Sequence, residues 1–197
     1  MNKREFLKLS LVGAGATVLN NKLSALEYYP RSADWAIIYS TWCGSSRDAA
    51  VWISEGMNGL ANVFDVREIP DLSMFDNIIV GGSIRSGKVS KELQYYLNKN
   101  KELLKGKVRG HFAVCGNMMQ PPTSKQTNDL INNHIALLTE TKDVPSRVFL
   151  GRVTFGLLDE ESAKMLKGFN TPEYDNLKRE ECMAFGKEIL NSYSESL

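Results

Sequence analysis

The chain has 197 residues, of which 43% are hydrophobic, which is enough for one sizeable buried core but not for two. Its 24 Lys and Arg nearly balance its 23 Asp and Glu, and no basic stripe carries interleaved aromatic residues, which argues against nucleic acid as a partner. Three widely spaced cysteines and two histidines exclude a disulfide framework and a CxxC motif, and they give little support for a metal site. We therefore expect one domain behind an N-terminal extension.

Residues 1–34 are predicted to be an export signal and a linker, and the domain is predicted over residues 35–197. A basic start is followed by a weakly apolar run at residues 9–19 and by small residues near Ala25, which is the pattern of an export signal. The apolar run is about half as long as the roughly 20 residues that a membrane-spanning helix needs. An amphipathic N-terminal helix is the alternative interpretation.

The basic start of this segment resembles a twin-arginine translocation signal. Lys3-Arg4 stands where that signal has two arginines, and Phe6-Leu7-Lys8 matches the residues that follow them. The resemblance implies export, with the protein periplasmic or membrane-associated on the outer side. This route moves folded proteins, so a cofactor could be loaded before export. A general secretory signal is the alternative.

The first strand and the first helix of the domain flank a loop rich in hydroxyl residues. Residues 35–40 form a near-continuous apolar run, as in a parallel strand buried on both faces, and helical spacing begins at Asp48. Residues 40–46 between them carry serines, a threonine and a glycine. Because the first amide groups of a helix have no intrahelical partner, this layout is typical of a phosphate cradle. An ordinary helix N-cap and turn is the alternative.

Strands and helices alternate along the rest of the chain. Further strands are predicted at residues 62–66, 77–84, 111–117 and 147–154, and helices at residues 48–60, 89–104, 123–141, 157–168 and 175–191. Alternation at this spacing predicts βαβ units. We therefore expect an α/β fold with a parallel sheet and helices on both of its faces.

Polar segments with glycines follow three of the strands, at residues 40–46, 82–88 and 115–117. We call these segments the first, second and third exits, and together they are the candidate ligand site. Ligands of open parallel sheets bind outside the carboxyl ends of the strands. Three hydrogen-bonding exits around one crevice, the first a phosphate cradle, predict a mononucleotide site, although each glycine pair alone also suits a tight turn. The candidate cofactor-binding residues are Ser40, Thr41, Trp42, Cys43, Gly44, Ser45, Ser46, Gly82, Ser83, Ile84, Arg85, Ser86, Gly87, Lys88, Cys115, Gly116 and Asn117.

The first exit resembles the FMN phosphate loop of the flavodoxin family. The residues that carry this resemblance are Tyr39-Ser40-Thr41-x-x-Gly44-x-Ser46-Arg47. Flavodoxins bind FMN at the switch point of a doubly wound sheet. The resemblance extends over roughly residues 35–190. It implies a flavodoxin-like three-layer sandwich, a five-stranded parallel sheet of order 2-1-3-4-5, and FMN as the cofactor.

Within that family, the second exit is similar to the loop of flavodoxin-type, quinone-dependent protoporphyrinogen oxidases. Here Gly82-Ser83-Ile84-Arg85-x-Gly87-Lys88 resembles their Ala-Ser-Ile-Arg-Tyr-Gly. Those oxidases have an aromatic, basic segment after the fifth strand, thought to meet the membrane and its quinone. Residues 155–161 of this chain are instead acidic and short of aromatic side chains. An export signal is also unexpected for haem synthesis, so FMN binding is the expectation and porphyrinogen oxidation the alternative.

The resemblance implies a role for each exit. Ser40–Ser46 would hold the FMN phosphate, and the backbone of Gly82–Gly87 would face the N5 and N1 edge of the flavin. Arg85 or Lys88 near that edge would stabilise a reduced anionic flavin, unless both are solvated loop cations. Cys115–Asn117 would line the other side of the ring.

Taken with these patterns, the resemblance implies an exported FMN-dependent electron carrier or oxidoreductase. Its partner would be a redox protein or a quinone, and the N-terminal segment could associate it with a membrane. Trp42 would stack on the flavin or pack against the edge of the sheet. Two alternatives stay open: a quinone-dependent protoporphyrinogen dehydrogenase, and a flavodoxin-like binding module that has lost FMN.

Overall fold

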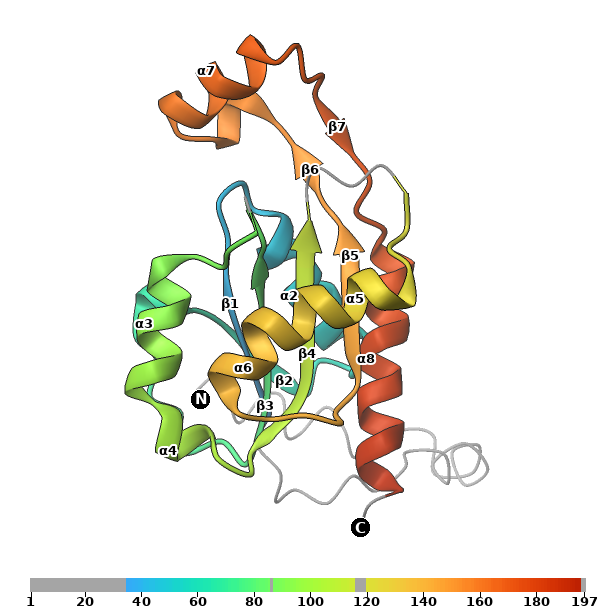
Figure 1. Cartoon of the computed structure of the whole chain (residues 1–197). Helices are drawn as coiled ribbons and strands as arrows, with labels where there is room; N and C mark the ends of the chain where they lie inside the picture. Colours follow the sequence, from blue (N-terminus) through green and yellow to red (C-terminus); the bar gives the residue numbers. More distant parts are fainter. Residues whose placement is uncertain (1–34, 86, 116–119, 196–197) are drawn as a thin grey trace, which may run out of the picture. The chain divides into compact units, whose positions relative to one another are not determined.

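The computed structural model describes residues 35–85, 87–115 and 120–195, and the predicted export signal lies outside them (Figure 1). The strands of the main sheet are β1 (Trp35–Ser40), β2 (Ala61–Asp65), β3 (Asn77–Ser83), β4 (Val108–Cys115) and β5 (Ser146–Leu150). They lie in the order β2-β1-β3-β4-β5, and every neighbouring pair is parallel. The predicted fold and strand order are confirmed.

Helices cover both faces of this sheet (Figure 1). The α-helices are α2 (Ser45–Gly56), α3 (Lys91–Lys99), α4 (Lys101–Leu104), α5 (Ser124–Leu130), α6 (Ala136–Thr139), α7 (Glu160–Gly168) and α8 (Arg179–Ser194). Two short 3-10 helices, η2 (Val66–Glu68) and η4 (Phe155–Leu157), and one π-helical stretch, η3 (Ile131–Ile135), complete the described helical structure. α2 and α8 pack together on one face. α3, α4, η3 and α6 supply buried side chains to the core on the other face.

Close packing fixes the strand and helix that carry the first exit. β1 is buried along its whole length. α8 approaches α2 so closely that a Cβ atom on Gly186 would lie 2.2 Å from the carbonyl oxygen of Ile53. Backbone contact of this kind leaves no room for sliding, because protein interiors are packed as densely as organic crystals.

The predicted fifth strand, residues 147–154, is wrong in its second half. β5 ends at Leu150, and β6 (Arg152–Val153) leaves the sheet to pair antiparallel with β7 (Tyr174–Asp175). The N–H of Gly151, between β5 and β6, still donates to the carbonyl of Cys115 at 3.0 Å. The chain therefore departs from the sheet directly after its last bond to β4.

Residues 152–175, from β6 to β7, form an insert between β5 and α8. It contains η4 and α7, which correspond to the helix predicted over residues 157–168. Figure 1 shows the insert standing beyond the carboxyl ends of the sheet strands. That edge is where a doubly wound fold binds its ligand.

Candidate functional site

The first exit places an open helix N-terminus at the carboxyl end of β1. Gly44 turns the chain with φ +84° and is the N-cap of α2, and no side chain among the described residues accepts a hydrogen bond from the first-turn N–H groups. The hydroxyl of Thr41 instead accepts the Gly44 N–H at 3.0 Å, inside the loop. The first amide groups of α2 are therefore left for a ligand, which favours the anion site over the ordinary N-cap.

A buried hydroxyl without a partner lies at the base of this loop. Ser40 is 4% exposed, and its Oγ has no hydrogen-bond partner within the part of the chain that the structure describes. A Cβ atom on Gly82, the neighbour of Ser40 in β3, would lie 2.7 Å from that oxygen. Since buried polar groups are almost always hydrogen-bonded, Ser40 Oγ is a candidate ligand contact.

Serine hydroxyls join the first exit to the second. Ser46 in α2 and Ser83 at the end of β3 share a 2.7 Å hydrogen bond between their Oγ atoms. The chain then turns back, with Arg85 and Lys88 exchanging backbone hydrogen bonds of 2.9 and 3.0 Å and Gly87 at φ +70°. The side chain of Lys88 is exposed. The predicted Ser86 lies outside the described residues.

The third exit differs from the prediction at its first residue. Cys115 is buried in the core under α3 and α6, and burial raises the pKa of its thiol to about 11. Val114, whose side chain points to the opposite face of the strand, lines the cavity at the site. The predicted Gly116 and Asn117 lie outside the described residues.

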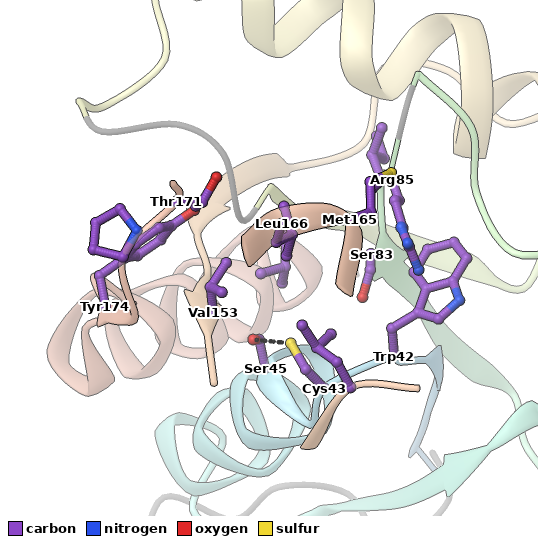
Figure 2. Close-up of a pocket in the computed structure, with 14 residues that line it drawn as sticks. Trp42, Cys43, Ser45, Ser83, Arg85, Val153, Met165, Leu166, Thr171 and Tyr174 are labelled. Carbon is purple, nitrogen blue, oxygen red and sulfur yellow. Dashed lines mark hydrogen bonds between the residues drawn. The ribbon is translucent and has the colours of Figure 1, made fainter. Parts of the chain in front are cut away.

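A cavity of about 470 Å³ joins the exits to the insert (Figure 2). From the exits it is lined by Trp42, Cys43, Ser45, Ser83, Ile84, Arg85 and Val114, and from the insert by Val153, Leu158, Met165, Leu166, Thr171, Pro172 and Tyr174. The second group was not predicted as part of the site: residues 147–154 and 157–168 were expected only as a strand and a helix.

The paired strands β6 and β7 form the stem of the insert, and this stem is attached to the first exit. The Arg152 N–H donates to the hydroxyl of Ser45 at 3.3 Å, and the Cys43 thiol donates to the carbonyl of Arg152 at 3.4 Å. The guanidinium of Arg152 pairs with Asp48 of α2 and lies 3.4 Å from Asp175 of β7. The side chains of Cys43 and Ser45 are thus partly engaged by the insert, while the amide groups of the α2 first turn are not.

Comparison with protein families identifies the fold. A family model described as a flavodoxin domain matches residues 36–177. The chain belongs to the flavodoxin family. The match includes the insert, so the insert lies inside the flavodoxin domain. No curated protein matches the chain.

Solved structures of flavodoxin-type proteins are similar to this chain at low sequence identity. The flavodiiron core of Flv1 from Synechocystis sp. PCC6803 has a TM-score of 0.50 and 14% identity, over 85% of this chain and 38% of that one. A short-chain flavodoxin associated with a bacterial microcompartment has a TM-score of 0.50 and 13% identity, over 81% and 98%. The FMN-bound flavodoxin of Fusobacterium nucleatum has a TM-score of 0.49 and 14% identity, over 82% and 97%. The chain spans little more than a third of the flavodiiron protein.

The described residues offer neither a cluster of metal ligands nor a membrane-spanning helix. They contain no group of three or more His, Cys, Asp and Glu side chains arranged to hold a metal ion. Within the same ranges, no helix has both the length and the hydropathy to cross a membrane. His111 is a buried core residue and shares a 2.9 Å hydrogen bond with Thr139.

Proposed function

We propose that this protein binds FMN at the carboxyl edge of its sheet and uses it to transfer electrons. The observation that carries the proposal is the first turn of α2, which follows Gly44 and has no side-chain cap in the described chain. A phosphate group would satisfy its amide groups and gain from the positive end of the helix dipole. Bound FMN supplies the redox chemistry, while the protein binds, orients and shields it.

The residues of the first exit suit a phosphate. The backbone N–H groups of Ser45, Ser46 and Arg47 begin α2 and would donate to the phosphate oxygens. Thr41 keeps the loop in shape through its bond to Gly44. The buried hydroxyl of Ser40, which lacks a partner among the described residues, would be a further donor.

The cavity suits the remainder of the cofactor. Its volume of about 470 Å³ lies within the range of roughly 300–1,000 Å³ typical of small-molecule sites. Ser45 and Ser83 make its floor polar near the exits, while Leu158 and Leu166 make its insert side apolar. The apolar side would exclude water from the flavin ring and strengthen the electrostatic interactions there.

Backbone groups of the second exit, more than its charged side chains, would contact the N5 and N1 edge of the flavin. The predicted cation Arg85 donates to Ser162 of the insert at 2.5 Å, so its guanidinium is already engaged. Lys88 is exposed beside the turn. We therefore assign the edge of the ring to the backbone of Ser83, Ile84 and Arg85, and a weaker role to the two cations.

Cellular location and electron partner are part of the proposal. The N-terminal segment, which lies outside the described residues, supports export to the periplasm or the outer side of the membrane through its Lys3-Arg4 pair and apolar run. The partner would be a redox protein or a quinone. An exported protein would acquire FMN before translocation, and its native form would then carry the cofactor.

A quinone-dependent protoporphyrinogen dehydrogenase is the second candidate function. The observation that favours it is the insert after β5, at the position where those oxidases carry their distinctive segment. The acidic residues 159–161 of the insert oppose it. Oxidation of a porphyrinogen with a quinone acceptor by the FMN-loaded protein would support this candidate, and absence of that reaction with electron transfer retained would remove it.

The absorbance spectrum of the purified full-length protein tests FMN binding. We expect the visible bands of flavin and uptake of added FMN by stripped protein. In Thr41→Asp, the new carboxylate still accepts the Gly44 N–H but repels a phosphate, so FMN affinity should fall at least about tenfold.

The matched control is Thr41→Ser, which keeps the hydroxyl and should bind FMN as the wild type does. Equal FMN affinity in the two variants would contradict the phosphate assignment. A colourless protein that takes up no FMN would instead support the remaining alternative, a flavodoxin-like binding module that has lost FMN.

A further inference from the structure

The η4 and α7 segment, residues 155–168, forms the tip of the insert. Arg85 connects the second exit to this tip. Its guanidinium donates to Ser162 Oγ at 2.5 Å and lies 3.6 Å from Asp159 Oδ2. Asp159 is the N-cap of α7 and accepts the Ser162 N–H at 2.8 Å, and the Ser162 hydroxyl also donates to it. The guanidinium carbon also lies 5.6 Å from the ring centroid of Trp42, and Figure 2 shows the two side chains next to each other.

The stem and the tip of the insert are attached with different strength. At the stem, the side chain of Arg152 is 16% exposed and joins α2 to β7 through Asp48 and Asp175. At the tip, the side chains of Arg85 and Asp159 are 33% and 55% exposed. Because exposed ion pairs contribute little and are screened by salt, the tip contact opens more readily than the stem.

The underside of the tip carries apolar side chains over the cavity. Leu158, Met165 and Leu166 line it from the η4 and α7 segment. A second hollow, of about 390 Å³, borders the Arg85 contact with Asp159, Ser162 and Met165 in its wall. Water and salt therefore reach the contact that holds α7 above the cavity.

We propose that the insert is a lid on the flavin site and that Arg85 is the positioning residue that latches it. The proposal rests on the proposed function for the identity of the ligand beneath the lid. With the latch closed, Met165 and Leu166 cover the cavity, so FMN cannot leave and a protein partner cannot reach the ring from that side. With the latch open, the insert pivots about the Arg152 stem and the site is accessible.

Limited proteolysis of FMN-free full-length protein tests the latch without reference to flavin. Trypsin cleaves after Lys164 and Lys167 in α7 when that helix opens. Arg85→Gln and Asp159→Asn each remove one charge, and Asn still caps a helix well. We expect both to speed cleavage at these two sites about tenfold, the loss expected for a hydrogen bond to a charged group. High salt should speed wild-type cleavage in the same direction.

The matched control is Glu160→Gln, which removes a charge from the adjacent position of α7. Its cleavage rate should equal that of the wild type. Equal rates in Arg85→Gln, Asp159→Asn, Glu160→Gln and wild type would overturn the latch. A global loss of stability in Arg85→Gln would raise cleavage throughout the chain, whereas the latch predicts a change confined to α7 and the same change in Asp159→Asn.

Release of FMN from loaded protein connects the latch to the site. On dilution, the recovery of free FMN fluorescence should be about tenfold faster in both latch variants than in Glu160→Gln. Faster cleavage of α7 with unchanged FMN release would overturn the lid. If the protein binds no FMN at all, the proposed function fails while the proteolysis result still decides the latch.

Discussion

The flavodoxin body and the insert are held by different kinds of interaction. In the body, β1 is wholly buried, and α2 and α8 touch through backbone atoms at Gly186. In α7 of the insert, Ser162 is the buried residue, and a half-exposed ion pair reaches from this helix to Arg85. Dense apolar packing makes the body beneath the site rigid, whereas exposed polar contacts allow the insert above it to open locally. The difference separates the part that binds the ligand from the part that controls access.

Adding one methyl group should affect the two regions very unequally. A Cβ atom on Gly186 would lie 2.2 Å from the backbone oxygen of Ile53, which cannot move aside as a side chain can. Gly186→Ala should therefore lower the free energy of unfolding by about 3 kcal/mol, measured by urea denaturation. In Gly156→Ala, within the insert, the new Cβ would meet no described atom within 4 Å, and the change should stay within about 0.5 kcal/mol. Similar losses in both variants would contradict the comparison.

Acid should weaken the body before it weakens the latch. Burial lowers the pKa of His111 to about 4, below its value near 6.5 in an unfolded chain. The unfolded chain therefore binds a proton that the native state does not, and stability falls as the pH drops from about 6.5 toward 4. Between pH 7 and pH 5, the wild type should lose about 2 kcal/mol more than His111→Gln in urea denaturation.

The latch keeps its charges over that pH range. The hydroxyl and N–H of Ser162, together with Arg85, hold the pKa of the Asp159 carboxyl below its ordinary value. That carboxylate stays ionised at pH 5, and it is protonated only as the pH falls through the lowered pKa.

An equal pH dependence of unfolding in wild type and His111→Gln would show that His111 is not the group responsible for the acid sensitivity of the body.

Local patterns predicted the body well because its determinants are local. The buried run at residues 35–40 and the hydroxyl residues around Gly44 specify a strand, a turn and a helix start within a dozen neighbours. The alternation of strands with helices then leaves few topologies for the sheet. The first exit and the parallel α/β class could therefore be predicted from the sequence, whereas the strand order was implied by the resemblance to flavodoxins.

The position of the insert over the site could not be predicted, because its contacts join residues far apart in the chain. Arg152 and Val153 suit a strand in the main sheet as well as they suit β6, and their partners in β7 lie some twenty residues later. The partner of Arg85 in α7 is still more distant, so its side chain was expected at the flavin edge. Tertiary pairing, which no local pattern records, decides both cases.

Comparison of FMN with riboflavin tests the central claim most directly, because the two ligands differ only in the phosphate. The flavin-stripped full-length protein is titrated with each ligand and binding is followed by quenching of flavin fluorescence. If the first turn of α2 holds the phosphate, FMN should bind about a hundredfold more tightly or better, as expected for two or more charge-assisted hydrogen bonds. Equal affinity for FMN and riboflavin, or binding of neither, would contradict the account.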